Sequence, residues 1–267
     1  MGVFKIQKMT DKIGVMDSGV GGLTILKELV SNMPSADFMY FGDTKNLPYG
    51  TKTKEELLFL NRNILNFFLS KDVKTVVIAC NTTSALTYEE LKKEFEPKGL
   101  KIYPLIQTVV KDAINDLKSD DCICVMATSA TVKSGKYKQE IEKVNPKLKV
   151  VEIPCSGFVE IVEQRKYDQQ ESFELIKEKM QIVLENNAKK VILGCTHYPY
   201  LVDLLSKFAP KEMFFNPAKT LAKCVAKELN PNGAGNVEFF VTSEPMEFKQ
   251  SAKLFFDIKN DIQLAIL

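Results

Sequence analysis

The sequence predicts an α/β protein with two similar lobes, each built on a parallel sheet and related to the other by a pseudo-twofold axis. Short segments rich in β-branched residues alternate with longer segments of helical periodicity, which is typical of parallel sheets. Two pairs of strand-like segments also resemble each other across the halves of the chain. The 267 residues, of which 45% are hydrophobic, suffice for one large domain or two ordinary ones.

The first half of the chain alternates strands and helices in order. Residues 12–16 predict a buried strand, and apolar residues recur at helical spacing over 21–31. A second strand is followed by a loop over 42–53 that contains a proline and a glycine. We therefore expect strands over 12–16, 38–41 and 75–79, and helices over 21–31, 54–69 and 84–95.

The second half repeats this order, with strands expected over 122–126, 150–153 and 191–193 and helices between and after them. Parallel strands need crossover connections, which are usually helices. The alternation of strands and helices therefore predicts a parallel sheet in each half.

Two segment pairs indicate an internal duplication. Residues 76–82 resemble 191–197, and 13–18 resemble 123–128, with matches at the polar residues that leave each strand. Buried strands also look alike simply because they are all rich in Val and Ile, so this explanation stays open. A duplication predicts one lobe from residues 1–104 and 215–267 and a second from 105–214, with the functional site in the cleft between them.

Composition and charge exclude several classes of protein. The chain has 36 Lys and Arg against 34 Asp and Glu, so no basic footprint favours nucleic acid as a partner. The first residues lack the apolar core of a secretory signal, and no apolar run is long enough to cross a bilayer. We expect a cytoplasmic protein that binds a small molecule and neither membrane nor nucleic acid.

The cysteines should be reduced in that compartment. The chain has six cysteines without a CxxC pair and a single His, which makes a zinc or His-rich metal site a weak hypothesis. We expect no metal.

Polar, reactive side chains stand at the carboxyl ends of four expected strands, over 17–19, 80–82, 127–129 and 195–197. Ligands of parallel sheets bind at this edge. Each segment precedes an expected helix, so free backbone N–H groups should point at the same place. The pattern predicts an anion site made of backbone and hydroxyl groups, since neither of the two arginines, Arg62 and Arg165, lies in these segments.

Cys80 and Cys195 occupy matching positions in the repeated segments, so the duplication places them facing each other across one cleft. Two opposed thiols, one ionised and one protonated, can take a proton from one face of a carbon and return it on the other. The alternative is that both are buried structural cysteines, which is our interpretation of Cys122, Cys124, Cys155 and Cys224.

A nucleotide site at the glycine-rich turn over 19–22 is another alternative. The spacing is G-x-G-G rather than G-x-G-x-x-G, and Asp17 would place a negative charge beside a pyrophosphate. We therefore do not expect a nucleotide there.

Taken together, these residues resemble the glutamate racemases of the cofactor-independent aspartate/glutamate racemase family. The resemblance rests on five groups of residues in the same order and spacing, which span 13–199: residues 13–22, 41–44 with 48–50, 79–82, 158–159 with Glu163, and 193–199.

The resemblance implies an isomerase that interconverts L- and D-glutamate by two-base proton transfer at Cα, without metal or other cofactor. It implies that Cys80 and Cys195 are the acid/base pair, that D-glutamate meets the first and L-glutamate the second, and that D-glutamate supplies peptidoglycan synthesis. It also implies a homodimer.

The resemblance implies further site residues. Asp17 would assist Cys80, and His197 and Glu163 would assist Cys195. The substrate contacts would come from Asp17, Ser18, Tyr49, Gly50, Asn81, Thr82, Thr128, Thr196 and His197.

The residues themselves leave some roles open. Asp17 should raise the pKa of a neighbouring thiol, so it would accept the thiol proton, bind the substrate ammonium, or merely cap a helix. His197 is either a catalytic partner or a satisfied polar residue, and Glu163 either assists it or lies on a solvated helix face. Thr83, and the segment 103–108, depart from the family pattern.

Other functions are also open. Another racemase of the same group, acting on aspartate or a hydantoin, is the nearest alternative. A non-catalytic amino-acid-binding or regulatory protein would use the same cleft. A thiol-redox protein would form a reversible disulfide between Cys80 and Cys195.

Overall fold

The computed structural model describes residues 12–229 and 231–267. Residues 1–11 lie outside the described residues, so the expected start of the first lobe at residue 1 and the expected lack of a signal segment are not addressed. Within the described residues, no helix combines the length and the apolar character that a bilayer crossing requires.

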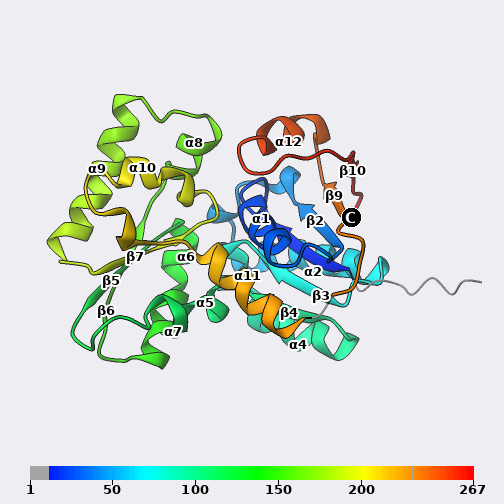
Figure 1. Ribbon diagram of the computed structural model, residues 1–267, viewed down its shortest axis with the longest axis horizontal. Coiled ribbons are helices and arrows are strands. Elements are labelled where there is room, and N and C mark those ends of the chain that lie inside the picture. Colours follow the sequence, from blue (N-terminus) through cyan, green and yellow to red (C-terminus); the bar gives the residue numbers. More distant parts are fainter. Residues whose placement is uncertain (1–11, 230) are drawn as a thin grey trace, which may run out of the picture.

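The described residues form two lobes, each built on a parallel sheet (Figure 1). Sheet A has the strand order β10-β9-β2-β1-β3-β4, and sheet B has the order β6-β5-β7-β8. The strands of sheet A are β1 Ile13–Asp17, β2 Phe38–Gly42, β3 Thr75–Ile78, β4 Lys101–Pro104, β9 Val237–Val241 and β10 Ile262–Leu264. Those of sheet B are β5 Cys122–Ala127, β6 Lys149–Pro154, β7 Lys190–Gly194 and β8 Phe214–Phe215. The predicted fold class is confirmed.

The two sheets share the order in which the chain builds them. In sheet A the first strand lies between the second and third, and the fourth follows at the edge, as β2-β1-β3-β4. Sheet B has the same order, as β6-β5-β7-β8. The similar segments 13–18 and 123–128 overlap β1 and β5, while 76–82 and 191–197 overlap β3 and β7. Equivalent places in the topology favour a duplication over a chance likeness of buried strands.

Helices cover both faces of each sheet. In the first lobe they are α1 Leu23–Asn32, α2 Lys54–Ser70, α3 Asn81–Leu86, α4 Tyr88–Phe95 and α12 Pro245–Ala252, whereas α5 Leu105–Ala113 and α11 Pro217–Glu228 lie where the lobes meet and contact elements of both. In the second they are α6 Ser129–Ser134, α7 Lys136–Val144, α8 Phe158–Glu163, α9 Gln170–Glu185 and α10 Val202–Leu205. Short 3₁₀ helices are η1 Thr44–Asn46, η2 Tyr49–Thr51, η3 Glu96–Lys98, η4 Tyr198–Leu201 and η5 Lys211–Met213.

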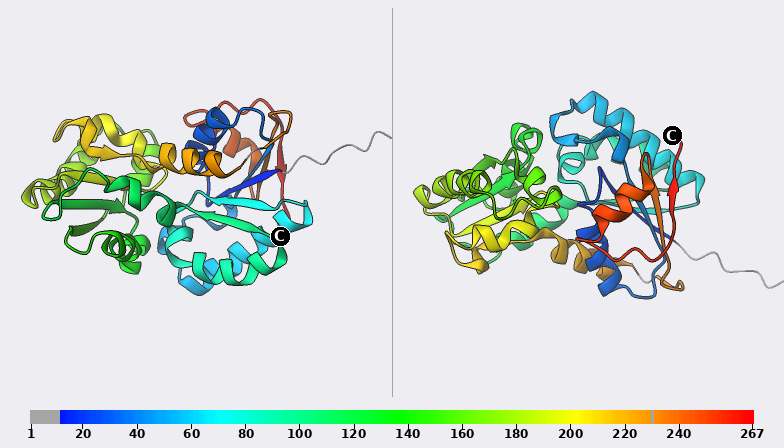
Figure 2. Two further views of the ribbon diagram at one scale, coloured as in Figure 1. Left: turned by 60° about the horizontal axis from the view of Figure 1, so that its bottom comes forward. Right: turned by 90° about the horizontal axis from the view of Figure 1, so that it is seen from above.

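The core follows from the alternation of side chains along buried strands. Val15 and Val77 pack with α1 on one face of sheet A, whereas Met16 and Ile78 pack with α2 and α4 on the other. Figure 2 shows α2 and α4 on the side of sheet A opposite α1 and α11. With both faces covered, the strands are apolar throughout, as parallel sheets require.

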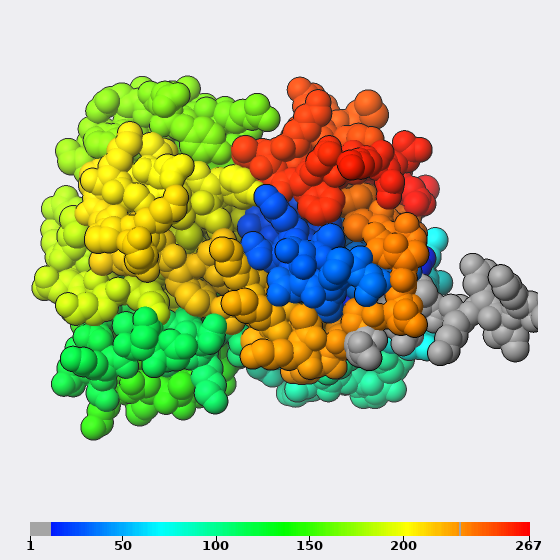
Figure 3. All heavy atoms as spheres, in the orientation of Figure 1, coloured from blue at the N-terminus to red at the C-terminus, as the bar shows by residue number. Residues whose placement is uncertain are grey.

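The lobes meet over an extended junction rather than through a thin linker. Helix α11 packs against α1 and α5, and the space-filling view shows it next to α1 where the lobes meet (Figure 3). Residues 237–264 add β9 and β10 to sheet A, while β8 lies in sheet B. The division of the chain at 104/105 and 214/215 stays a prediction.

The helix expected over 84–95 is wrong in its start and its continuity. Helix α3 begins at Asn81, directly after Cys80, and ends before Thr87, where the backbone leaves the helical region at φ −124°. The Thr87 hydroxyl donates to the carbonyl of Thr83, so a local side-chain hydrogen bond accompanies the break. The early start makes Cys80 the N-cap residue of α3.

Candidate active site

A cavity of about 340 Å³ lies between the lobes, at the carboxyl ends of both sheets. The expected site residues line it, with one exception: Asp17 lies just behind the wall and is 2% exposed. Those in the wall are Ser18, Tyr49, Gly50, Cys80, Asn81, Thr82, Thr128, Glu163, Cys195, Thr196 and His197. The structure therefore brings together residues that are far apart in the sequence.

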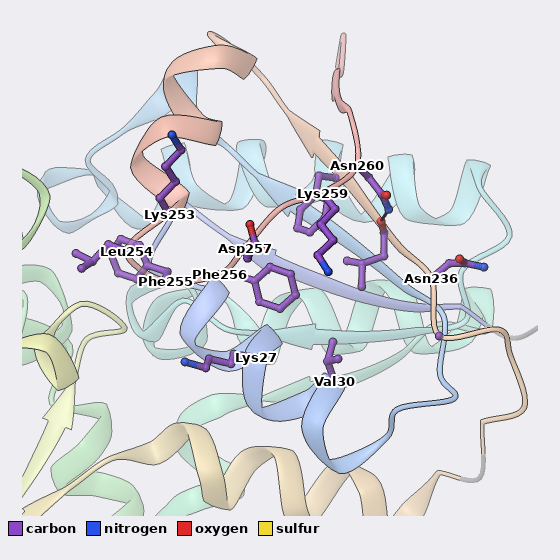
Figure 4. A pocket seen from close by; sticks show the side chains of 13 residues that line it. Lys27, Val30, Asn236, Lys253, Leu254, Phe255, Phe256, Asp257, Lys259 and Asn260 are labelled. Carbon is purple, nitrogen blue, oxygen red and sulfur yellow. Dashed lines mark hydrogen bonds between the residues drawn. The ribbon is translucent and has the colours of Figure 1, made fainter.

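A larger groove of about 700 Å³ lies elsewhere, between α1 and the segment that follows α12 (Figure 4). Its rim carries the exposed side chains Lys27, Lys253 and Lys259, and none of the expected site residues lines it. Phe255 links the two regions, because it lines this groove and its ring contacts the His197 ring edge-on at 5.6 Å.

The strand register places Asp17 beside Cys80. Met16 pairs with Ile78, and the Ala79 N–H donates to the Met16 carbonyl at 2.9 Å, so both strands end side by side. Burial, together with the nearby Asp17 carboxylate, raises the pKa of Cys80 to about 12. In the protein without substrate, Cys80 is therefore a protonated thiol at neutral pH.

Asp17 is a buried carboxylate with one unsatisfied oxygen. Its Oδ1 accepts from the Gly19 N–H at 3.0 Å, whereas Oδ2 has no hydrogen-bond partner among residues 12–229 and 231–267. Burial raises the pKa of Asp17. The alternative role as a helix cap is wrong, because a turn follows Asp17 and Gly22 precedes α1. The other two roles, accepting a proton or binding an ammonium group, both suit the unsatisfied oxygen.

Cys195, His197 and Glu163 form a connected chain. The Cys195 sulfur lies 3.8 Å from His197 Nδ1, and His197 Nε2 lies 3.0 Å from Glu163 Oε1. Burial of the His197 ring disfavours its charged form, but the contacts with Cys195 and Glu163 outweigh burial and raise the pKa of His197 to about 10. Glu163 is an exposed residue of α8, as the alternative expected, and its carboxylate also contacts His197. The neighbours of the two sulfurs therefore differ in charge: Cys80 lies beside a carboxylate, and Cys195 lies beside a cationic imidazole.

Because His197 is the single His in the chain, its titration gives one unambiguous NMR signal. We expect the ring to stay protonated through neutral pH and to lose its proton near pH 10. Since the folded pKa exceeds the reference value of 6.5, His197 stabilises the fold below pH 6.5, and this contribution disappears as the pH rises through about 10.

The Glu163→Gln variant provides the test, because it keeps the side-chain shape and removes the charge. Its His197 should titrate at lower pH than in the unmodified protein. Glu185→Gln, at the end of α9, is a matched control that leaves His197 unchanged. A His197 that titrates near 6.5 in the unmodified protein would contradict the proposed contacts.

Hydroxyl groups connect the lobes across the cavity. Thr82 Oγ1 lies 3.0 Å from Thr128 Oγ1, and both lie close to Thr131 Oγ1, at 3.3 and 2.9 Å. Tyr137 donates to Asn81 Oδ1 at 2.7 Å, so the Asn81 amide is oriented by the second lobe. Thr128 also caps α6, accepting from the Thr131 N–H. These groups can donate hydrogen bonds to a carboxylate.

The loop with Tyr49 and Gly50 is held by a buried carboxylate. Tyr49 donates to Asp43 Oδ2 at 2.6 Å, and Thr242 donates to Asp43 Oδ1 at 2.7 Å. A Cβ on Gly50 would lie 3.1 Å from the Thr128 Cβ, so the glycine allows this loop to approach the second lobe closely.

The glycine-rich turn packs against the second lobe rather than forming a phosphate loop. A Cβ on Gly21 would lie 2.4 Å from Thr196 Oγ1 and 2.6 Å from His197 Nδ1. Protein atoms therefore fill the space that a pyrophosphate would need. The Tyr40 hydroxyl holds the turn by donating to the Gly19 carbonyl at 2.6 Å.

The structure adds residues to the cavity wall beyond the expected site residues. Cys155, interpreted as structural, lines the wall, with its thiol 3.4 Å from the Ile153 carbonyl and its own carbonyl accepting from Tyr198 at 3.0 Å. Ser129 and Tyr198 adjoin expected site residues, so the motifs carried that signal. The other additions are Leu47, Pro48, Thr51, Ser156, Gly157, Val159 and Glu160.

The charge of the wall agrees with the expected shortage of cations. None of the described residues that line the cavity is Lys or Arg, and its ionisable groups are carboxylates, thiols, tyrosines and His197.

The expectation that a helix start follows each of the four strand ends holds for Cys80 and Thr128. A turn follows Asp17, and a 3₁₀ helix follows Cys195.

Two parallel lobes of the same strand order, with a small cavity that holds two thiols and an imidazole at their common edge, define an enzyme of the α/β class that acts on a small molecule. Comparison with known proteins gives the family. The model of the Asp/Glu/Hydantoin racemase family matches residues 13–224. The chain therefore belongs to this racemase family, and it is an isomerase.

Relatives agree over almost the whole chain. The glutamate racemase of Carboxydothermus hydrogenoformans is 37% identical over 255 residues, which cover 93% of each chain. That of Trichodesmium erythraeum is 35% identical, covering 96% of this chain and 95% of its own. The crystal structure of glutamate racemase from Francisella tularensis in complex with D-glutamate has a TM-score of 0.87 at 29% identity, covering 97% of this chain and 98% of its own.

Proposed function

We propose that this protein interconverts L- and D-glutamate by moving a proton at Cα between Cys80 and Cys195, without metal or pyridoxal phosphate. One observation carries the proposal: two thiols at equivalent exits, after β3 and β7, line the same cavity. A thiol on each side of one carbon is the arrangement that inversion by proton transfer needs.

Starting from L-glutamate, the Cys195 thiolate takes the Cα proton, and the C–H electron pair remains on carbon as a carbanion. The Cys80 thiol then donates its proton to the opposite face, which gives D-glutamate and leaves Cys80 as the thiolate. The high pKa of Cys80, about 12, supports its role as the proton donor in this direction. The reverse reaction exchanges the two roles.

The substrate would be held mainly by neutral donors. We assign its carboxylates mainly to hydroxyl and amide groups of the wall and to backbone N–H groups, since neither Lys nor Arg is among the described residues that line the cavity. Preorganised donors in a cavity shielded from water stabilise the carbanion most strongly. The proposed contacts are Asp17, Ser18, Tyr49, Gly50, Asn81, Thr82, Thr128, Thr196 and His197.

The relatives favour glutamate over aspartate or a hydantoin, because those described above are named glutamate racemases. The decisive experiment is polarimetry on each glutamate enantiomer after metal chelation and without added cofactor. We expect both to lose optical rotation, with deuterium at Cα of the product in deuterated water. Aspartate and a hydantoin serve as comparison substrates.

The alternatives give different results in the same experiment. Binding of glutamate with unchanged optical rotation would support a non-catalytic amino-acid-binding protein instead. A thiol-redox protein would lose two free thiols reversibly on mild oxidation and show no change in rotation.

We also propose that the protein acts in the cytosol as a homodimer and supplies D-glutamate for peptidoglycan synthesis. Rescue of a bacterial strain that requires D-glutamate tests the role, and light scattering tests the dimer.

A further inference from the structure

Thr83 is a buried side chain that the proposed mechanism does not use. It is fully buried and does not line the cavity, and no substrate contact is assigned to it. Its hydroxyl has no hydrogen-bond partner within residues 12–229 and 231–267. A buried hydroxyl without a partner is unfavourable and calls for an explanation.

The position of Thr83 provides one. Cys80 is the N-cap residue of α3, and Thr83 is the third residue of that helix. At this position the backbone N–H can reach the side chain of an N-cap residue, although the Cys80 side chain makes no capping hydrogen bond in this structure. Both the N–H and the hydroxyl of Thr83 favour the thiolate form of Cys80 and lower the pKa of its thiol, against the larger effects of burial and Asp17.

Hydrogen bonds fix the backbone of Thr83. Its carbonyl accepts from the Thr87 hydroxyl at 2.8 Å, and Asn61 on α2 donates to the Thr87 hydroxyl at 3.3 Å. These contacts use the Thr83 backbone and leave its hydroxyl unpaired. The Thr83 backbone is therefore fixed, while the hydroxyl of its side chain remains free to donate a hydrogen bond.

We propose that Thr83 is a positioning residue whose hydroxyl donates a hydrogen bond to the Cys80 sulfur once that thiol has lost its proton. The proposal rests on the proposed function, in which Cys80 alternates between thiol and thiolate. While Cys80 is a neutral thiol, the Thr83 hydroxyl makes no hydrogen bond. When Cys80 becomes a thiolate, its negatively charged sulfur becomes a strong acceptor for this hydroxyl.

The test measures the Cys80 thiolate directly, so it does not depend on racemase activity. In a Cys195→Ser background, the rate at which iodoacetamide alkylates Cys80 is followed against pH by peptide mass spectrometry. The ionisable groups facing Cys80 are Asp17 on β1, Tyr40 on β2, Tyr49 on η2 and residue 195 after β7, and the variants below leave them in place.

Thr83→Val removes the hydroxyl at nearly constant shape. We expect alkylation below the midpoint to slow by about 10-fold, because a hydrogen bond to a charged group is lost, and the pH midpoint to move upward. Thr83→Ser restores the donor and should restore the rate. Thr220→Val, which removes another buried threonine hydroxyl on α11, should leave Cys80 unchanged.

Equal alkylation in Thr83→Val and the background would overturn the proposal, as would a Thr83→Ser variant as slow as Thr83→Val. If the Val variant fails to fold, Thr83→Ala compared with Thr83→Ser makes the same distinction. If Thr83→Val leaves alkylation unchanged in the Cys195→Ser background and leaves racemisation unchanged when Cys195 is present, the role of Thr83 is rejected and the proposed function is not. A protein without racemase activity, in which alkylation still depends on the hydroxyl, rejects the proposed function instead.

Discussion

Replacing Cys80 by Ala should reduce racemisation of both glutamate enantiomers by at least about 10³-fold, because inversion needs a proton donor on each face of Cα. Cys195 remains beside His197 in this variant and can still remove a proton from its own side. We therefore expect deuterium from solvent to enter L-glutamate without inversion, as measured by proton NMR. Cys195→Ala should show the converse, with slow exchange into D-glutamate only.

Cys224→Ala is the matched control, since this cysteine lies on α11, outside the cavity. It should racemise glutamate at the unmodified rate. Substantial racemisation by Cys80→Ala or Cys195→Ala would contradict the two-base scheme. Exchange into both enantiomers by one variant would show that a single group reaches both faces.

Asp17→Asn should lower kcat by about 10²-fold, the size of a typical general acid–base contribution. The carboxylate is buried beside Cys80 with one oxygen unsatisfied, and the amide is isosteric but cannot carry the charge. The KM distinguishes the two roles that remain. An unchanged KM favours proton transfer with Cys80, whereas a large rise in KM favours binding of the substrate ammonium.

Asp37→Asn provides a comparison for this variant. Asp37 is also buried, but it precedes β2 at the other end of sheet A and accepts from backbone N–H groups of Ala234 and Asn236. It should change thermal stability with little effect on kcat. Full activity of Asp17→Asn would remove Asp17 from the proposed mechanism.

The strand ends were predicted well from sequence because buried strands and the polar residues that follow them leave a local pattern. Cys80 and Cys195 follow apolar runs of the same type, and the carboxyl edge of a parallel sheet is a general ligand site. The helix after Cys80 was predicted less well. Its start depends on the N-cap geometry of Cys80 and its break on a hydrogen bond at Thr87, and neither has a periodic signal.

Pairings between distant residues had no signal in the residue pattern, and only the family resemblance indicated that Glu163 and His197 act together. Glu163 lies on α8, 34 residues before His197, and was as plausible on a solvated surface as in a site. The same holds for the unpaired hydroxyl of Thr83 and for the wall position of Cys155. Such contacts depend on how helices pack on the sheets, which a single sequence does not encode locally.

The sequence alone therefore determined the parallel α/β class and the position of two cysteines after similar strands, and it indicated a repeated unit, because these follow from short-range hydrophobic periodicity and turn residues. The family resemblance named a neighbour for each thiol, but only the tertiary structure decided their burial and contacts: a buried carboxylate beside Cys80, and an imidazole that contacts both Cys195 and Glu163. The physical reason is that burial and charge act through space over a few ångströms, between groups brought together only when both sheets are packed.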